Sequence, residues 1–187
     1  MNFIQLDTSR LSLVQINKDH VESYYNIMSK DEVTKYYGME SLQSREEAEK
    51  MTDSFQTNFE NKRGIRWGII DKASSEFIGT VGLNNLNLPN KKAEIGYELH
   101  PFYWKKGITT EAVKEVLNYS FGTLVLHRIG AITFPENERS TQLLVRLGFS
   151  REGLIRANLY QNGEFHDTYI FSLLRPEWEK MLKEDNK

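Results

Sequence analysis

The segment Trp104–Ala112, WKKGITTEA, places two lysines and one glycine before two threonines and a glutamate that begin a predicted helix. N–H groups at the start of a helix have no partner within the helix and carry positive partial charge, so they attract an anion. Gly107 leaves room for a ligand and adopts backbone angles that other residues avoid. The segment matches neither a Walker A loop nor G-x-G-x-x-G. Its residues alone fit either a phosphate-binding loop or a plain loop before a Thr-capped helix.

Several other kinds of chemistry lack the residues that they need. The chain contains no cysteine, which excludes disulfides, thiolate metal ligands and a cysteine nucleophile. The histidines are far apart and show no spacing typical of metal ligands, so we expect no metal. They are His20, His100, His127 and His166. The 24 Lys and Arg residues nearly balance the 26 Asp and Glu residues, which predicts neither direct nucleic-acid binding nor attraction to an anionic membrane.

The composition is that of one folded domain. The chain has 187 residues, of which 39% are hydrophobic and 27% charged, so it is able to bury a core. No repeat, linker or low-complexity segment divides it, and we expect a single domain over residues 1–187. The N-terminal residues lack the apolar core of a signal peptide, and no apolar run approaches the roughly 18 residues of a membrane span. We therefore expect a cytoplasmic protein.

Hydrophobic periodicity predicts alternating strands and helices on both sides of the glycine loop. Seven strands are expected, at residues 11–16, 65–71, 76–87, 93–100, 127–134, 150–160 and 165–174. Helices are expected after Asn17, Ser44, Gly107 and Asn137, and Ser44 begins a capping-box pattern. Residues 175–187 are expected to form only a short tail with a frayed end. The interleaved elements indicate a mixed α/β or α+β sheet with helices on its faces.

Signatures in several parts of the chain resemble one known family. The segment LHPFYWKKGITTEAV resembles motif A of the GNAT acetyltransferase superfamily, whose Q/R-x-x-G-x-G/A loop holds the pyrophosphate of coenzyme A. Similarity to the RimJ/RimL-like branch, which includes N-terminal acetyltransferases of ribosomal proteins, lies in KAEIGYEL, NERSTQLLVRLGFSREG and NGEFHDTYIFSLLRPEW. The resemblance covers nearly the whole chain. It implies the GNAT fold, with a mixed, mostly antiparallel sheet of about seven strands that splays between strands four and five and carries helices on both faces.

The loop departs from the family pattern at two positions. Trp104 stands where the family has Gln or Arg, and Thr109 replaces the second Gly or Ala. Backbone amides supply the main binding groups, so the resemblance still implies binding of acetyl-CoA as cosubstrate, with added charge from Lys105 or Lys106 and a hydroxyl from Thr109. The residues implied to bind coenzyme A are Leu99, Trp104, Lys105, Lys106, Gly107, Ile108, Thr109, Thr110, Asn137 and Ser140.

The family mechanism implied by the resemblance is direct attack of a primary amine on the acetyl thioester. The backbone N–H of Leu99 would polarise the carbonyl, Ser140 would protonate the thiolate, and Glu98 is the candidate base. Each side chain also has a purely structural interpretation. Asn137 is a good helix N-cap, Ser140 suits a first helical turn, and Glu94 and Glu98, which share one face of a strand, suit a solvated face or an ion pair.

The missing strong base favours one class of acceptor. An α-amine has a pKa of about 7.7–8.0 and a lysine amine about 10.4, so the α-amine needs much less help in losing its proton near pH 7.5. We therefore expect transfer to a protein or peptide N-terminus. The alternatives are a small-molecule N-acetyltransferase that acts on a polyamine, amino acid or antibiotic, and a non-catalytic acyl-CoA-binding module. Family relatives are sometimes dimers, so the resemblance also allows a homodimer.

Overall fold

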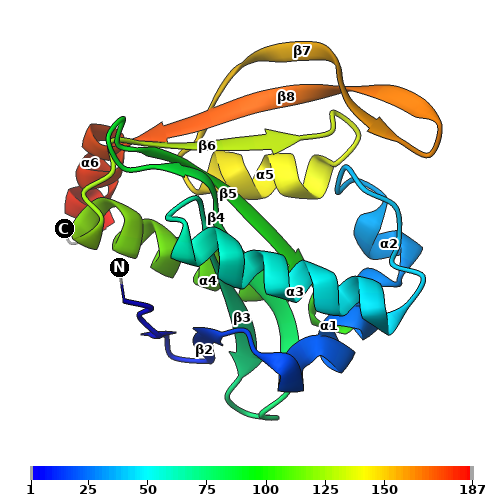
Figure 1. Ribbon diagram of the computed structural model, residues 1–187. Coiled ribbons are helices and arrows are strands. Elements are labelled where there is room, and N and C mark those ends of the chain that lie inside the picture. Colours follow the sequence, from blue (N-terminus) through cyan, green and yellow to red (C-terminus); the bar gives the residue numbers. More distant parts are fainter. Residues whose placement is uncertain (1, 186–187) are drawn as a thin grey trace.

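A computed structural model describes residues 2–185 and has an eight-stranded sheet at its centre (Figure 1). The strands are β1 (Leu6–Asp7), β2 (Leu11–Gln15), β3 (Ile65–Asp71), β4 (Phe77–Asn87), β5 (Lys92–Leu99), β6 (Arg128–Thr133), β7 (Ser150–Gln161) and β8 (Glu164–Leu174). They lie in the order β1-β2-β3-β4-β5-β6-β8-β7. The described residues thus contain the seven expected strands and one more, β1, which spans two residues. Two residues are too few to show the alternation by which a strand is recognised in a sequence.

Strands β5 and β6 separate after a short parallel ladder. All other neighbouring strands run antiparallel, whereas these two are parallel and pair at three positions, the last joining Glu94 with Gly130. Strand β5 continues to Leu99 and β6 to Thr133, so beyond Glu94 one edge of β5 has no neighbouring strand. This gap, called the β5–β6 opening below, confirms the splay expected between the fourth and fifth of the predicted strands.

Helices cover both faces of the sheet (Figure 1). Helices α1 (Val21–Met28) and α3 (Arg45–Glu60) pack together over one face, and α4 (Ile108–Asn118) packs on the other. The remaining helical elements are α2 (Asp31–Thr34), α5 (Glu138–Arg146), α6 (Arg175–Asp185), two 3-10 turns at Lys18–His20 and Pro101–Tyr103, and a π-helical turn at Tyr119–Thr123. None of the helices within residues 2–185 combines the length and apolar character needed to cross a membrane.

Side-chain caps begin two of the predicted helices. The Ser44 hydroxyl accepts a hydrogen bond from the Glu47 N–H at 3.3 Å and begins α3. The Asn137 carboxamide accepts one from the Ser140 N–H at 3.2 Å and begins α5. These caps satisfy N–H groups that have no partner within the helix. The structure therefore confirms the expected starts of both helices.

The C-terminal segment corrects the sequence-based prediction. Residues 175–185 form helix α6 and not the expected tail, while residues 186–187 lie outside the described residues. Trp178 is only 5% exposed, and its ring centroid lies 6.0 Å from that of Phe121, which belongs to the π-helical turn after α4. The surface that covers Trp178 comes from a distant part of the chain. The segment itself is mostly polar, so its own pattern gave no sign of this packing.

Candidate active site

Helix α4 begins without a side-chain cap. Its N-cap is Gly107, at φ +75°, a left-handed conformation that favours glycine. No side chain caps the first turn, so the Thr-capped interpretation of this loop is wrong. The Glu111 N–H donates to the Gly107 carbonyl at 3.1 Å, while the N–H groups of residues 108–110 precede the first bond of this kind. An anion placed at this helix start would meet those groups and the positive end of the helix dipole.

A network from the N-terminal strands fixes this helix start. The Arg10 guanidinium donates to the Glu111 carboxylate at 2.6 Å and to the Lys106 carbonyl at 2.9 Å. Glu111 also accepts the Thr8 hydroxyl at 2.5 Å. Burial would raise the pKa of Glu111, but these hydrogen bonds outweigh it and hold that pKa below its ordinary value. Arg10 is thus a further cation beside Gly107, one that the sequence pattern of the loop could not reveal.

The two predicted lysines of the loop differ in their surroundings. The Lys106 ammonium lies 3.9 Å from the ring centroid of Phe102 and 5.2 Å from that of Tyr103, both in the 3-10 turn before it. Lys105 is exposed and has φ +62°. Ile108 is 4% exposed and belongs to the core, so only its backbone is available to a ligand. Thr109 and Thr110 are half-buried in the first turn of α4.

Trp104 is oriented towards the β5–β6 opening. Its indole N–H donates to the Leu99 carbonyl at 2.8 Å, which fixes the ring against the end of β5. The His100 N–H donates to the Ile78 carbonyl of the preceding strand segment at 2.8 Å. Successive N–H groups of a strand point to opposite edges, so the Leu99 N–H points away from β4 and into the opening. The Leu99 side chain is 5% exposed and lies in the core, so only the backbone of Leu99 is available to a ligand.

Ser140 and Tyr97 join the two sides of the opening. The Tyr97 hydroxyl, from β5, lies 2.6 Å from the Ser140 Oγ in the first turn of α5. Burial raises the pKa of Tyr97 to about 12, so this phenol keeps its proton at neutral pH. Alternation along β5 places Tyr97 on the face opposite Glu98, but no sequence pattern connects Tyr97 with Ser140. The position of Tyr97 on that face was the only sequence signal for the contact, because the contact itself depends on how α5 packs against β5.

Glu98 lies on the other face of β5 in a buried ion pair. Its side chain is 1% exposed and lies 3.5 Å from the Arg66 guanidinium, which is 7% exposed. The Tyr37 hydroxyl donates to the Glu98 carboxylate at 2.9 Å, and the Thr80 hydroxyl also donates to it. Burial, followed by the Glu98 charge, raises the pKa of Tyr37 well above its ordinary value. Glu98 therefore has the ion pair that its structural interpretation anticipated, and its function as a base stays a prediction.

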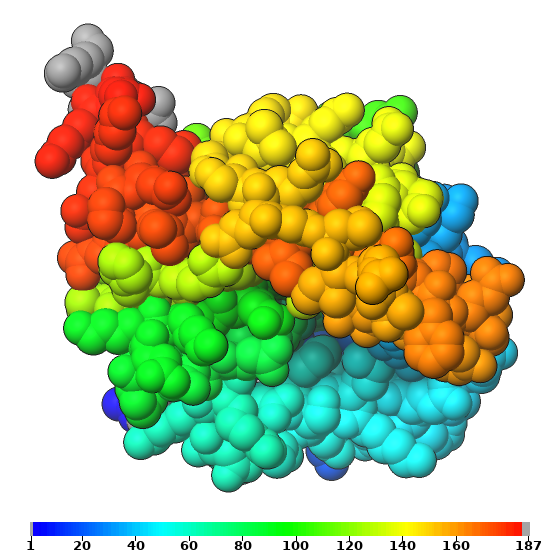
Figure 2. Space-filling view, turned by 90° about the horizontal axis from the view of Figure 1, so that it is seen from above, coloured from blue at the N-terminus to red at the C-terminus, as the bar shows by residue number. Residues whose placement is uncertain are grey.

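Glu94 has a simpler environment on the same face. Its carboxylate accepts the Asn85 side-chain amide at 2.9 Å, and its side chain is only partly buried. A cavity of about 550 Å³ opens on this side of the sheet between α3 and strands β3 and β4, and Arg66 and Asn84 are among its lining residues. Figure 2 shows a hollow between α3, the green strands and the orange hairpin β7–β8. The face that holds Glu98 is therefore also a face on which the sheet borders a cavity.

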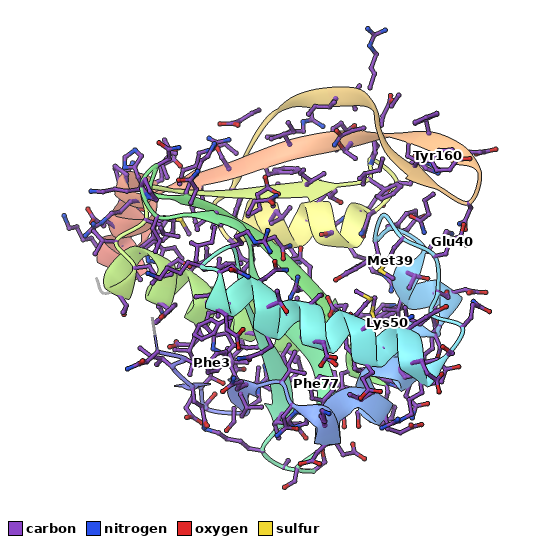
Figure 3. The ribbon with its side chains drawn as sticks, in the orientation of Figure 1. Phe3, Met39, Glu40, Lys50, Phe77 and Tyr160 are labelled. Atoms are coloured by element: carbon purple, nitrogen blue, oxygen red, sulfur yellow. The ribbon has the colours of Figure 1, made fainter. Side chains whose placement is uncertain are left out.

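One buried side chain attaches the loop after α2 to the β7–β8 hairpin. Gln161 is 3% exposed and donates to the carbonyls of Thr34 and Met39 at 2.9 and 2.8 Å. Its carboxamide oxygen accepts the Gly38 N–H at 3.1 Å. Figure 3 shows Met39 beside the end of the hairpin that carries Tyr160. This contact thus joins segments that are far apart in the sequence.

The fold and site together define a class of protein. Two parallel strands separate next to an uncapped, glycine-started helix, and backbone N–H groups face the space between them. This arrangement fits an extended phosphate-bearing cosubstrate, as acyl-CoA-dependent transferases require. Within the described residues no group of three or more His, Cys, Asp and Glu side chains is arranged to hold a metal ion.

Comparison with known proteins identifies the family within this class. The family model described as acetyltransferase (GNAT) domain matches residues 10–150. The Bacillus subtilis protein named uncharacterized N-acetyltransferase YoaA is 43% identical over 171 residues, which cover 91% of this chain and 97% of that protein. The chain belongs to the GNAT acetyltransferase family. It is an N-acetyltransferase whose cosubstrate is acetyl-CoA.

Two further relatives have names that include a substrate. The Escherichia coli [ribosomal protein uS5]-alanine N-acetyltransferase is 33% identical over 113 residues, which cover 60% of this chain and 58% of that protein. The crystal structure of spermidine N-acetyltransferase from Vibrio cholerae in complex with CoA and spermine has a TM-score of 0.81 at 24% identity, with 92% of this chain and 99% of that chain covered. The second likeness shows the shared fold.

Proposed function

We propose that this enzyme acetylates the α-amine of a protein or peptide N-terminus. The observation that carries the proposal is the enclosure of Glu98, the candidate base, by Arg66, Tyr37 and Thr80. A lysine or polyamine amine has a pKa about three units above pH 7.5, so its deprotonation costs on the order of 4 kcal/mol. A carboxylate that already forms a buried ion pair is poorly suited to removing that proton. The pKa of an α-amine lies well under one unit above pH 7.5, so an α-amine fits this site better.

The similarity to relatives supports the same proposal. A protein named for alanine N-acetylation of ribosomal protein uS5 shares 33% identity over 113 residues with this chain. We therefore propose that the chain belongs to the RimJ/RimL-like branch, with a ribosomal protein as one candidate acceptor. The spermidine enzyme is the neighbour that supports the alternative, a small-molecule acceptor. The two alternatives share the same donor side and differ only in the acceptor.

In the proposed reaction the amine nitrogen attacks the acetyl carbonyl carbon, the C–N bond forms and the C–S bond breaks. The Leu99 N–H stabilises the negative charge that develops on the carbonyl oxygen. The Ser140 hydroxyl gives its proton to the thiolate, and the ammonium loses one proton to solvent before the attack. The nitrogen loses its second proton as the amide forms, and through solvent this proton restores the one given by the Ser140–Tyr97 pair. For Ser140 to donate its own proton, Tyr97 must be the donor in the 2.6 Å contact between their oxygens. Tyr97 then orients Ser140 and replaces its proton.

Asn137 has a double use in this proposal. Its carboxamide oxygen accepts the Ser140 N–H at 3.2 Å, which holds the first turn of α5 in place. Its NH₂ group remains available to a carbonyl of the pantetheine arm. The loop of residues 104–110 supplies backbone N–H groups to the pyrophosphate. A non-catalytic acyl-CoA-binding module would use the same loop but would not depend on Ser140.

An acetyl-CoA consumption assay over N-terminal peptides, polyamines and amino acids tests the acceptor. With an α-amine acceptor, kcat/KM should rise and level off near pH 8, because the amine itself titrates there. With a lysine or polyamine acceptor the rise should continue towards pH 9–10. Efficient transfer to spermidine with negligible transfer to every peptide would overturn the acceptor proposal. Binding of acetyl-CoA without transfer to any amine would instead support the non-catalytic alternative.

A further inference from the structure

An arginine from helix α5 rests on the tryptophan of the glycine loop. The Arg139 guanidinium carbon lies 5.1 Å from the ring centroid of Trp104. That ring is itself fixed, because its indole N–H donates to the Leu99 carbonyl at 2.8 Å. The Arg139 side chain forms no hydrogen bond or ion pair with any residue of the part of the chain that the structure describes. Its N–H donors are therefore positioned by the ring and free to bind a ligand.

This contact crosses the β5–β6 opening at its outer end. Trp104 follows β5 and precedes α4, whereas Arg139 lies in the first turn of α5, which follows β6. The Tyr97–Ser140 contact crosses the same opening from within β5. The first N–H groups of α4, which would hold a phosphate, come only a few residues after Trp104 in the sequence. The guanidinium above that ring is then a cation that α5 contributes from across the opening.

Neighbouring cations are less suited to this task. Arg10 is committed to the Glu111 carboxylate and the Lys106 carbonyl. The Lys106 ammonium lies against the rings of Phe102 and Tyr103. Lys105 has no such partner, but an ammonium is a point charge on a flexible stem, whereas a planar guanidinium binds phosphate oxygens in pairs. Stacking on a fixed ring also reduces the side-chain entropy that binding removes.

We propose that Arg139, held by Trp104, binds a phosphate of the nucleotide end of coenzyme A. The inference rests on the proposed function of the loop at residues 104–110 as the coenzyme A site. It assigns to α5, across the opening, the charge that sequence analysis expected from Lys105 or Lys106. The ligand group is either the diphosphate or the 3′-phosphate, which have the same chemistry and can be separated by choice of ligand.

Calorimetry with coenzyme A, dephospho-coenzyme A and pantetheine tests the proposal. Arg139→Ala should raise the Kd for coenzyme A about tenfold, equivalent to about 1.4 kcal/mol. Arg146→Ala, an exposed arginine at the other end of α5, is the matched control and should leave the Kd unchanged. The difference between wild type and Arg139→Ala should shrink with added salt, since the interaction is between charges. Arg139→Lys should recover part of the loss.

The ligand series identifies the phosphate. A loss that disappears with dephospho-coenzyme A assigns Arg139 to the 3′-phosphate, and one that remains there but disappears with pantetheine assigns it to the diphosphate. Trp104→Ala should weaken binding in the same direction, and adding Arg139→Ala to it should cost little more. Equal coenzyme A affinity in Arg139→Ala and wild type would overturn the inference, as would a loss confined to Lys105→Ala. Failure of the wild-type protein to bind coenzyme A would instead contradict the proposed loop function.

Discussion

Replacing Tyr97 with phenylalanine tests the Tyr97–Ser140 pair with little change in shape. The substitution removes one hydroxyl whose oxygen lies 2.6 Å from the Ser140 Oγ and keeps the ring in its place. A typical hydrogen bond contributes about 0.5–1.5 kcal/mol to stability, so the variant should fold with a modest loss in its free energy of unfolding. The Ser140 hydroxyl would remain but would lose the group that orients it. Its proton would no longer be replaced from the same side.

The expected kinetic effects follow from these functions. Loss of a general acid costs roughly 100-fold or more in rate, so Ser140→Ala should lower kcat by about that factor. Tyr97→Phe leaves the donor in place and should lower kcat by less, about tenfold, or about 1.4 kcal/mol. The KM for acetyl-CoA should change little in both variants. Since the two hydroxyls act as one unit, the double variant should be no slower than Ser140→Ala alone.

Measurements must be made where chemistry limits the rate, with single-turnover acetyl transfer as the assay. The raised pKa of Tyr97, about 12, keeps the phenol protonated across the assay range. The ratio of wild-type to Tyr97→Phe rates should therefore stay constant from pH 7 to about pH 10. The neutral form is favoured in the folded state, so the associated stability is present below about pH 10 and is lost as pH rises towards 12.

Three results would refute this reasoning. Wild-type single-turnover rates in Tyr97→Phe would show that the hydroxyl contact is only structural. A mild effect of Ser140→Ala combined with a severe effect of Tyr97→Phe would make Tyr97 the direct proton donor. Fully additive losses in the double variant would show that the two hydroxyls act independently.

Three further predictions concern the loop, the buried ion pair and acid stability. Gly107→Val should raise the Kd for coenzyme A at least tenfold, or about 1.4 kcal/mol, since φ +75° disfavours a β-branched residue and the start of α4 would distort; Gly122→Ala, with open space around it, is the control, and unchanged affinity in calorimetry would contradict the loop assignment. Glu98→Gln leaves the Arg66 guanidinium buried without its counter-charge and should cost on the order of 3 kcal/mol in urea unfolding, while transfer to an α-amine in the folded variant should change only mildly. Glu152 has a pKa of about 2, lowered first by its bond from Arg128, so its stabilising effect should be present above about pH 4.5 and lost as pH falls towards 2; thermal unfolding of Glu152→Gln should show a weaker acid dependence than wild type.

Much of the fold could be predicted because its signals are local. Ser44 and Asn137 begin their helices through hydrogen bonds that span three residues, so the residue types and spacing were sufficient. Alternation located seven of the eight strands for the same reason. Strand β1 and helix α6 were missed because one is too short to show a period and the other depends on a distant surface that buries Trp178.

The sequence by itself determined the family and the cosubstrate, and it predicted the segments that bind this cosubstrate. Gly107 and the residues around it carry a recognisable pattern because backbone geometry and helix starts depend on near neighbours along the chain. The tertiary structure alone decided which side chains meet. Tyr97 meets Ser140, Arg139 meets Trp104 and Glu98 meets Arg66. Each contact joins residues of two different elements and so depends on how those elements pack against each other, which no pattern within a single segment records.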